Sequence, residues 1–544
     1  MSEAGTTIPG LSRQDAGMAL ALGVAYVVLL VGTSSTLGYA RDEGFYFHAA
    51  ESYAGWLDLL LRTPREALTR RAVDAAWEVN PEHPPLLKAL FGVSWLLLQK
   101  KLHLFAHEGT SFRFPAMCLS GLGVGIIYAW GREAVSRRAG IFAAVSFAFV
   151  PTTFYHAHLA CFDAPIAALW TTVAYAYWKS LRHGAPWPVL TGVLFGLAFA
   201  SKHNSWFLPI AFGLHTVLLR GRRLADDWRE DRLAIPSALL WMALLGPVFL
   251  VLLWPLLWWD GAARFASYVR FHLQHEYYNM EFLGQTYFRP PMPRAYAWIT
   301  TAATVPLVTL VAAVAGLLQS VRVWRRAPET ERSTVLLWAI GIFVSYAAWL
   351  SPGTPIFGGT KHWLTAYPFL CLFGSRAFDA AAAVIEERFP HPRHFAATAA
   401  LVAALSSSVV QSLRAHPWGL SAYTPLVGGA PGAASLGLGR GFWGYQTGAV
   451  VDVLNARVPR NGSVYVHDTT YESFRMLQRD GRLRGDLRPV WSPAGADAAV
   501  YHHEQHMAGV EYQIWVALGT TRPWVVRGID GVPVVMVYGR GVGE

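Results

Sequence analysis

The chain has 544 residues, of which 53% are hydrophobic and only 15% are charged. Soluble globular proteins carry about 25% charged residues, so this composition indicates a membrane protein with many spanning segments. The net charge of +10 is weak evidence for nucleic-acid binding, because most basic residues fall in short runs between apolar segments, where they orient a protein in the membrane. The three cysteines lie in apolar segments without metal-ligand spacing, so no disulfide framework is expected.

A spanning helix needs about 20 apolar residues, and we identify about eleven candidate segments. They lie at 16–38, 113–131, 139–157, 164–181, 187–201, 205–219, 234–258, 296–318, 333–350, 362–380 and 395–413. The first is longer than the apolar part of a cleavable signal and lacks an evident cleavage site. We therefore expect it to remain as a spanning helix.

A shorter apolar stretch at 85–99 contains Lys88, and we expect it to lie in the membrane interface. If it does not span and the N-terminus is inside, the basic runs at 137–138, 220–223 and 325–326 all fall in cytoplasmic loops, as the positive-inside rule requires. The predicted cytoplasmic loops are 132–138, 179–183, 220–232, 322–332 and 386–394. Nearly all unusual polar residues then lie on the opposite, extracytoplasmic side.

The character of the chain changes after residue 415. A glycine-rich stretch at 416–440 reads as a linker. Helix-like and strand-like pieces then alternate over 441–544, and Asp530-Gly531 between two of them is typical of a hairpin turn. The predicted fold is a polytopic α-helical membrane domain over 1–415, with a first extracytoplasmic loop at 40–112, followed by a small extracytoplasmic α/β domain.

Asp42 and Glu43 directly follow the first spanning segment. An acidic pair at a membrane edge is costly unless it faces water or a cation. Such a carboxylate can act as a general base towards a hydroxyl or amine, or hold a divalent cation through oxygen. The plain alternative is a solvated helix end.

Basic residues follow on the same predicted side. His83 and Lys88 flank the entry to the interfacial stretch and can reach an anionic group, although a simple turn before a helix explains them as well. Arg113 opens the next spanning segment and can hold phosphate in a bidentate manner or reach to the interface. Lys202 and His203, and later Lys361 and His362, each lie between apolar segments, as headgroup anchors or phosphate ligands.

Asp163 follows His156 and His158. An His-x-His pair with a nearby aspartate could hold a transition metal, but no third strong ligand has fixed spacing. We expect Asp163 to bind a polar substrate or to orient a base.

Five short motifs follow one another in order: the acidic pair, His-Pro-Pro-Leu-x-Lys from His83, Arg-Phe-Pro-Ala from Arg113, Phe-Asp-Ala-Pro around Asp163, and Ser-Lys at Lys202. Over residues 15–380 this ordered set resembles the GT-C fold glycosyltransferases, in particular the protein O-mannosyltransferases and bacterial aminoarabinose transferases. The His-x-His pair is a departure from that pattern. The tail lacks the repeat domain of the eukaryotic protein mannosyltransferases and resembles the small extracytoplasmic domain of bacterial members.

The resemblance implies transfer of a hexosyl or pentosyl group from a polyprenyl-phosphate donor to an acceptor, which could be a lipid, a glycan or a protein. It implies a bacterial inner-membrane enzyme with a periplasmic site, without nucleic acid as a partner. Asp42 would be the base, with Glu43 beside it and Asp163 as a further acidic site residue. His83, Arg113 and Lys202 would bind the donor, Lys361 and His362 align more loosely, and His272, His275 and Glu276 could form a lid. We expect no cofactor and no essential metal, although a divalent cation at Asp42 and Glu43 would also be chemically reasonable.

Two other classes fit a polytopic chain. Charges inside a membrane also mark transporters and lipid flippases, but here they gather at one surface, and no inverted repeat is visible. A membrane scaffold with a binding domain would have no use for the set of acids and cations.

The predicted orientation is testable with fused reporters. A reporter after Arg326 should be cytoplasmic, and one at the C-terminus should be extracytoplasmic. The reverse result would mean that 85–99 spans the membrane.

Overall fold

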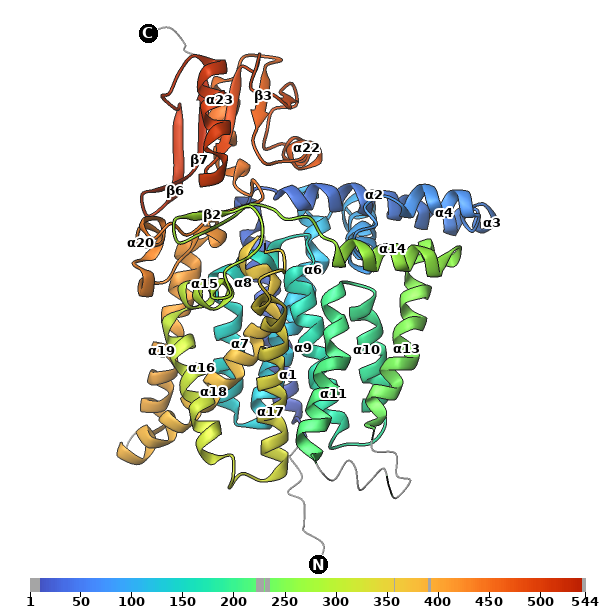
Figure 1. Cartoon of the computed structure of the whole chain (residues 1–544), viewed down its shortest axis with the longest axis vertical. Coiled ribbons are helices and arrows are strands. Elements are labelled where there is room, and N and C mark those ends of the chain that lie inside the picture. Colours follow the sequence, from blue (N-terminus) through green and yellow to red (C-terminus); the bar gives the residue numbers. More distant parts are fainter. Residues whose placement is uncertain (1–9, 222–228, 230–234, 357, 390–392, 541–544) are drawn as a thin grey trace, which may run out of the picture.

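The structure is a computed structural model that describes residues 10–221, 229, 235–356, 358–389 and 393–540. A bundle of helices forms one end of the molecule, a layer of helices lies across the bundle, and a small sheet domain lies beyond that layer (Figure 1). The predicted fold class, a helical membrane domain with a small C-terminal α/β domain, is confirmed.

Each segment predicted to span is helical in the bundle. The helices are α1 (Arg13–Thr33), α6 (Glu108–Ala134), α7 (Arg137–Ala148), α8 (Pro151–His158), α9 (Asp163–Ser180), α10 (Trp187–Phe199), α11 (Phe207–Arg220), α13 (Ser237–Leu253), α16 (Leu307–Val323), α17 (Glu329–Ala347), α18 (Tyr367–Arg388) and α19 (Arg393–Ala415). Among the described residues, five helices are long and apolar enough to cross a membrane, and α7 with α8, bent by 69°, would make a sixth. Helices α10, α13 and α16 are apolar but shorter.

Prolines explain where two predicted spans are broken. The segment predicted at 139–157 bends between α7 and α8, where Pro151 starts the second helix. The segment predicted at 296–318 divides into α15 (Tyr296–Thr304) and α16, with Pro306 before the second helix. A proline has no N–H to continue the helix in front of it but is well suited to open a new one.

The basic loops gather at the end of the bundle that is far from the sheet domain. Asp15 in α1 pairs with Arg132 at 3.0 Å and with Arg137 at 2.9 Å. Arg138 pairs with Asp379 of α18 at 2.7 Å. The predicted loops at 220–232 and 386–394 lie partly outside the described residues.

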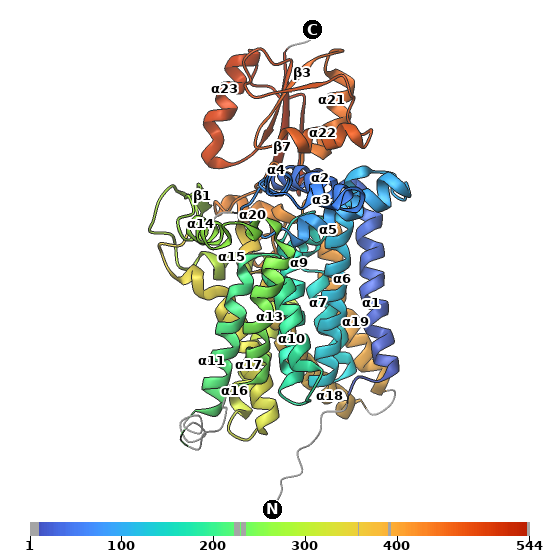
Figure 2. The ribbon, with the colours of Figure 1, turned by 90° about the vertical axis from the view of Figure 1, so that its right-hand side faces the viewer.

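The helices α2 (Arg41–Arg62), α3 (Pro64–Ala67), α4 (Arg70–Trp77) and α14 (Gly261–Leu273) lie across the opposite end (Figure 1; Figure 2). Helix α2 buries Tyr46, Ala50, Tyr53 and Trp56, a spacing that places one apolar face against the bundle. The stretch predicted to be interfacial forms α5 (Leu86–Ser94) and a π-helical segment, Trp95–Lys101. It is not among the helices that qualify as spans within the described residues.

The C-terminal sheet has the strand order β4-β3-β5-β7-β6. Its strands are β3 (Ser463–Val466), β4 (Arg488–Val490), β5 (Ala498–His502), β6 (Val525–Ile529) and β7 (Val532–Gly539), with helices α21 (Val451–Arg457), α22 (Tyr471–Arg479) and α23 (Ala508–Leu518). Strands β3, β4 and β5 are parallel, and β7 is antiparallel to β5 and β6. The predicted turn joins β6 to β7, with Asp530 and Gly531 at positive φ. Within the stretch predicted as a linker lies α20 (Gly429–Ser435), and the hairpin of β1 (Met280–Phe282) and β2 (Gln285–Tyr287) contacts it through Gly284 and Gly437.

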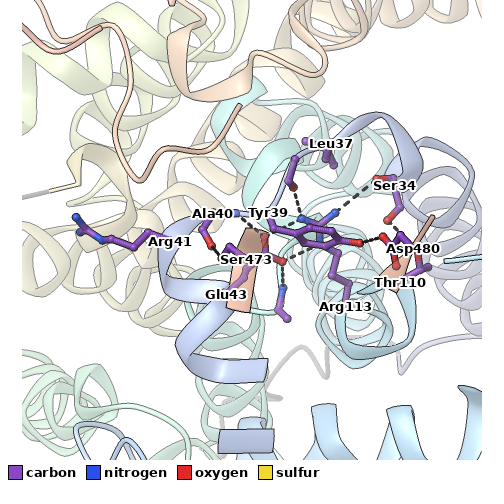
Figure 3. A network of polar contacts seen from close by, with 12 residues as sticks. Ser34, Leu37, Tyr39, Ala40, Arg41, Glu43, Thr110, Arg113, Ser473 and Asp480 are labelled. Carbon is purple, nitrogen blue, oxygen red and sulfur yellow. Dashed lines mark hydrogen bonds and ion pairs between the residues drawn. The ribbon is translucent and has the colours of Figure 1, made fainter. Parts of the chain in front are cut away.

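A buried ion pair joins α2 to α6. Arg113 donates from Nε to Glu43 Oε1 and from Nη2 to Glu43 Oε2, both at 2.7 Å (Figure 3). The Arg113 side chain is 1% exposed and that of Glu43 is 0% exposed. Glu43 also accepts hydrogen bonds from the backbone N–H groups of Ala40 and Ala160, each at 3.0 Å. Every oxygen of this carboxylate is therefore engaged, and the two helices are held at a fixed register.

The sheet domain docks on the segment around this pair. Ser473 of α22 donates to the carbonyl of Ala40 at 2.9 Å, Arg482 donates to that of Leu37 at 2.6 Å, and Tyr39 donates to Asp480. A Cβ on Gly38 would lie 2.7 Å from the Tyr445 carbonyl oxygen and 2.8 Å from the Gly448 nitrogen, and a Cβ on Gly44 would collide with Thr470 and Ser473. At Gly38 and Gly44 the helical domain and the sheet domain lie so close together that no side chain would fit at either position.

Replacing Arg113 by methionine should lower the free energy of unfolding by about 3–5 kcal/mol, because it leaves the Glu43 carboxylate buried without its cation. Thermal unfolding of the detergent-solubilised protein would measure this. The exposed pair of Arg527 with Asp452, at 3.4 Å, provides the control. Arg527→Met should change stability by no more than about 0.5 kcal/mol, and an equal effect of the two substitutions would contradict the prediction.

Candidate functional site

A cavity of about 700 Å³ lies beneath the layer of α2 and α14. It is lined by charged and polar residues together with a wall of aromatic side chains. The charged residues are Arg41, Asp42, Glu82, Asp163, Lys202 and Lys361, and the aromatic wall includes Trp170, Trp206, Phe207, Phe271 and Trp349. Such a mixture suits a ligand that is charged at one end and apolar at the other.

Asp42 lies in the first turn of α2 and lines the cavity. Its Oδ2 is 3.9 Å from Lys361 Nζ, and its Oδ1 is 3.7 Å from Arg41 Nε. The Lys361 ammonium lies 4.0 Å from the centre of the Trp443 ring, a cation–π contact. Burial lowers the pKa of Lys361, although Asp42 and Asp163 act in the opposite direction.

Asp163 begins α9 and accepts a hydrogen bond from Lys202 at 2.6 Å. Lys202 comes from the junction between α10 and α11. Nδ1 of His156 lies 3.9 Å from the other Asp163 oxygen. Asp163 thus brings a lysine and a histidine from separate segments to one carboxylate.

His158 is directed away from this group. It contacts Thr33 Oγ1 of α1 at 2.8 Å and the carbonyl of Phe154 at 2.7 Å. His156 and His158 therefore have different surroundings, and the described residues include no group of metal ligands around them.

Three predicted site residues lie behind the cavity wall. Glu43 and Arg113 bind each other and are absent from the lining, as is Lys88. The Lys88 ammonium is buried and donates to the backbone carbonyls of Asn80 and His83, the latter at 3.2 Å. These contacts hold the turn that carries His83, so Lys88 and Arg113 shape the cavity from outside.

His83, His203 and His362 line the cavity, and so do His272 and His275 of the predicted lid. Nε2 of His272 donates to the Glu82 carbonyl at 2.9 Å. Glu276 is exposed and does not line the cavity. The predicted lid segment therefore forms one wall through its histidines.

Sequence reasoning missed Trp443 and Glu82, which both line the cavity. Trp443 lies between α20 and the first helix of the sheet domain, and its carbonyl accepts the backbone N–H of Arg41 at 2.8 Å. No local sequence pattern indicates that Trp443 lines a cavity. Glu82 stands next to His83 and could have been selected with it. Burial and the nearby Asp42 raise the pKa of Glu82.

Comparisons with known proteins agree with this architecture. Residues 82–259 match the family model described as dolichyl-phosphate-mannose-protein mannosyltransferase. No curated protein sequence matches the chain. Archaeal oligosaccharyltransferase AglB from Archaeoglobus fulgidus, in complex with an inhibitory peptide and a dolichol-phosphate, aligns with TM-score 0.50 at 12% identity over 93% of this chain and 71% of AglB. ArnT from Cupriavidus metallidurans, bound to undecaprenyl phosphate, aligns with TM-score 0.46 at 15% identity over 96% of this chain and 98% of ArnT.

The family match covers α5 to α13, the part of the chain that carries His83, Asp163, Lys202 and His203. The alignment with AglB extends the likeness to the whole helical architecture. The chain is therefore a multi-pass membrane protein with the GT-C fold, and its residues 82–259 are similar to the protein mannosyltransferases.

Proposed function

We propose that this protein is a glycosyltransferase that takes a sugar from a polyprenyl-phosphate donor and passes it to an acceptor at the extracytoplasmic face of a bacterial inner membrane. The observation that carries the proposal is the cavity itself. It places the Asp42 carboxylate 3.9 Å from Lys361 and includes a second buried cation, Lys202, beside an apolar wall. The family-model match supports the choice of a lipid-linked donor.

In the proposed reaction, Asp42 accepts the proton of the acceptor hydroxyl or amine. The acceptor atom attacks the anomeric carbon, and the bond from that carbon to the phosphate oxygen breaks. The electron pair of the broken bond stays on the phosphate, and attack from the opposite face inverts the anomeric carbon. Lys361 and Lys202 stabilise the negative charge on the departing phosphate, as preorganised cations do in a site shielded from water.

The aromatic wall is assigned to the prenyl chain. Trp206 and Phe207 follow the Lys202 segment, and Phe207 is 37% exposed on the bundle surface. A prenyl chain could thus pass from the membrane along these rings while its phosphate reaches the lysines.

Glu43 does not suit a role as a metal ligand beside Asp42. Both of its oxygens are engaged by Arg113 and by backbone N–H groups. A divalent cation at the acidic pair would have to break a buried ion pair. We therefore assign no step to a cation at this position.

Replacing Asp42 by asparagine should lower the rate of sugar transfer by about 10²–10⁴-fold, since a general base supplies a factor of that size. The measurement is sugar release from polyprenyl-phosphate-mannose and polyprenyl-phosphate-glucose by purified protein in native membrane extract. Asp58→Asn is the matched control, because Asp58 lies on the same helix in an exposed pair with Arg62 at 2.8 Å. Release that survives in Asp42→Asn would refute Asp42 as the base, and no release with either donor would favour a transporter.

Lys361→Met should lower transfer by about 10²–10³-fold, because one stabilising group for the leaving charge is lost. Lys361→Arg should retain part of the activity. Burial lowers the pKa of Lys361, so its ammonium loses the proton at a lower pH than that of an ordinary lysine. As the pH is raised, wild-type transfer should therefore begin to decline at that lower pH. Arginine stays charged, so the fall in Lys361→Arg should move to higher pH. Identical pH profiles of wild type and Lys361→Arg would exclude this role.

A further inference from the structure

Three histidines from separate segments meet at one wall of the cavity. His83 precedes α5, His203 follows α10 and His272 lies at the end of α14. One ring nitrogen from each lies within 4.8 Å of the other two. The ring centroids of His203 and His272 are 4.1 Å apart, and those of His83 and His272 are 5.6 Å apart. The fold therefore gathers three imidazoles that are far apart in sequence.

The proton of His272 is fixed by its surroundings. Its Nε2 lies 2.9 Å from the carbonyl oxygen of Glu82. A carbonyl oxygen only accepts, so Nε2 carries the proton and Nδ1 of the neutral ring keeps its lone pair. Histidines that bind metals are commonly oriented in this way, with the second nitrogen donating to a carbonyl.

The other two rings have unsatisfied nitrogens. Nδ1 of His83 and Nδ1 of His203 are buried and have no hydrogen-bond partner among the described residues. A buried polar atom without a partner is costly and calls for an explanation. A neutral imidazole binds a metal ion through such a nitrogen.

We propose that His83, His203 and His272 bind one transition-metal ion of the zinc class, with a coordination position left open towards the cavity. Imidazole nitrogen favours Zn²⁺, Cu²⁺ and Ni²⁺ over Mg²⁺ and Ca²⁺. Zn–N bonds of about 2.0–2.1 Å in tetrahedral geometry place the nitrogens about 3.4 Å apart. Small side-chain rotations would close the present separation. Three protein ligands with an open fourth position are the arrangement of a zinc ion that also takes an exogenous ligand.

The open position has a natural occupant, and this step rests on the proposed function. The charged groups that line the cavity are balanced, with Arg41, Lys202 and Lys361 against Asp42, Glu82 and Asp163. A donor phosphate would add negative charge to this set. A divalent ion on three neutral histidines would offset that charge, so the ion would bind a phosphate oxygen of the donor.

The test uses the full chain in detergent, stripped with a chelator, desalted and titrated with ZnCl₂ alone. Bound metal is counted by mass spectrometry after removal of free ion. Wild type should bind one Zn²⁺ per chain, and His272→Ala and His203→Ala should each weaken binding by at least about tenfold. His275→Ala is the matched control, since His275 lines the same cavity but lies outside the trio, and it should bind like wild type. Co²⁺ in place of Zn²⁺ should give the absorption spectrum of a four-coordinate site.

Wild type without bound Zn²⁺, or equal binding by His272→Ala, would overturn the proposal. Elution profiles in size-exclusion chromatography check that each variant is folded. If the alanine variants are not folded, His83→Gln replaces them as the test variant. Asp42→Asn should still bind Zn²⁺. Intact Zn²⁺ binding without any sugar transfer by wild type would thus reject the proposed function and keep the metal site. Sugar transfer by a wild type that binds no Zn²⁺ would reject the metal site and keep the proposed function.

Discussion

The buried ion pair between Glu43 and Arg113 is the constraint on which the rest of the site depends. It fixes the start of α2 against α6, so the neighbouring Asp42 enters the cavity at a defined position. Through the N–H of Ala160 it also fixes the loop that leads to Asp163. Arg113 further lies over the Tyr39 ring at 4.4 Å. Two charges removed from water thus hold Asp42 and Asp163 in register, at a desolvation cost that only the close contact between Glu43 and Arg113 offsets.

Much of the fold could be predicted because membranes impose simple rules. Apolar length located the spanning helices, and the basic runs sorted the loops to one end. Breaks within spans were harder to foresee, because a single proline such as Pro306 divides a helix without lowering the hydropathy around it. A strand as short as β4 could not be predicted either, since three residues carry too little pattern.

The candidate site was only partly predictable, because residue type does not reveal the direction of a side chain. Arg113 and Lys202 are both cations beside apolar helices. Arg113 forms a buried ion pair with Glu43, however, whereas Lys202 lines the cavity. The histidine trio could not be found by spacing, because its members come from three segments that are far apart in the sequence. Trp443 was equally hidden, since it reaches Lys361 from the far end of the chain. Tertiary contacts, not motifs, decide which charges remain available for chemistry.

The close approach at Gly38 and Gly44 has a consequence for how such a chain can change over evolution. A side chain at either position would run into the backbone around Tyr445 and Gly448 or into Thr470 and Ser473. The sheet domain is therefore not an interchangeable module that could be lost or replaced by recombination while the helical bundle stays as it is. The backbone of a foreign domain would not fit this interface. Substitutions in α2 and in α22 must therefore be compatible with each other, although the two helices are more than four hundred residues apart in the sequence.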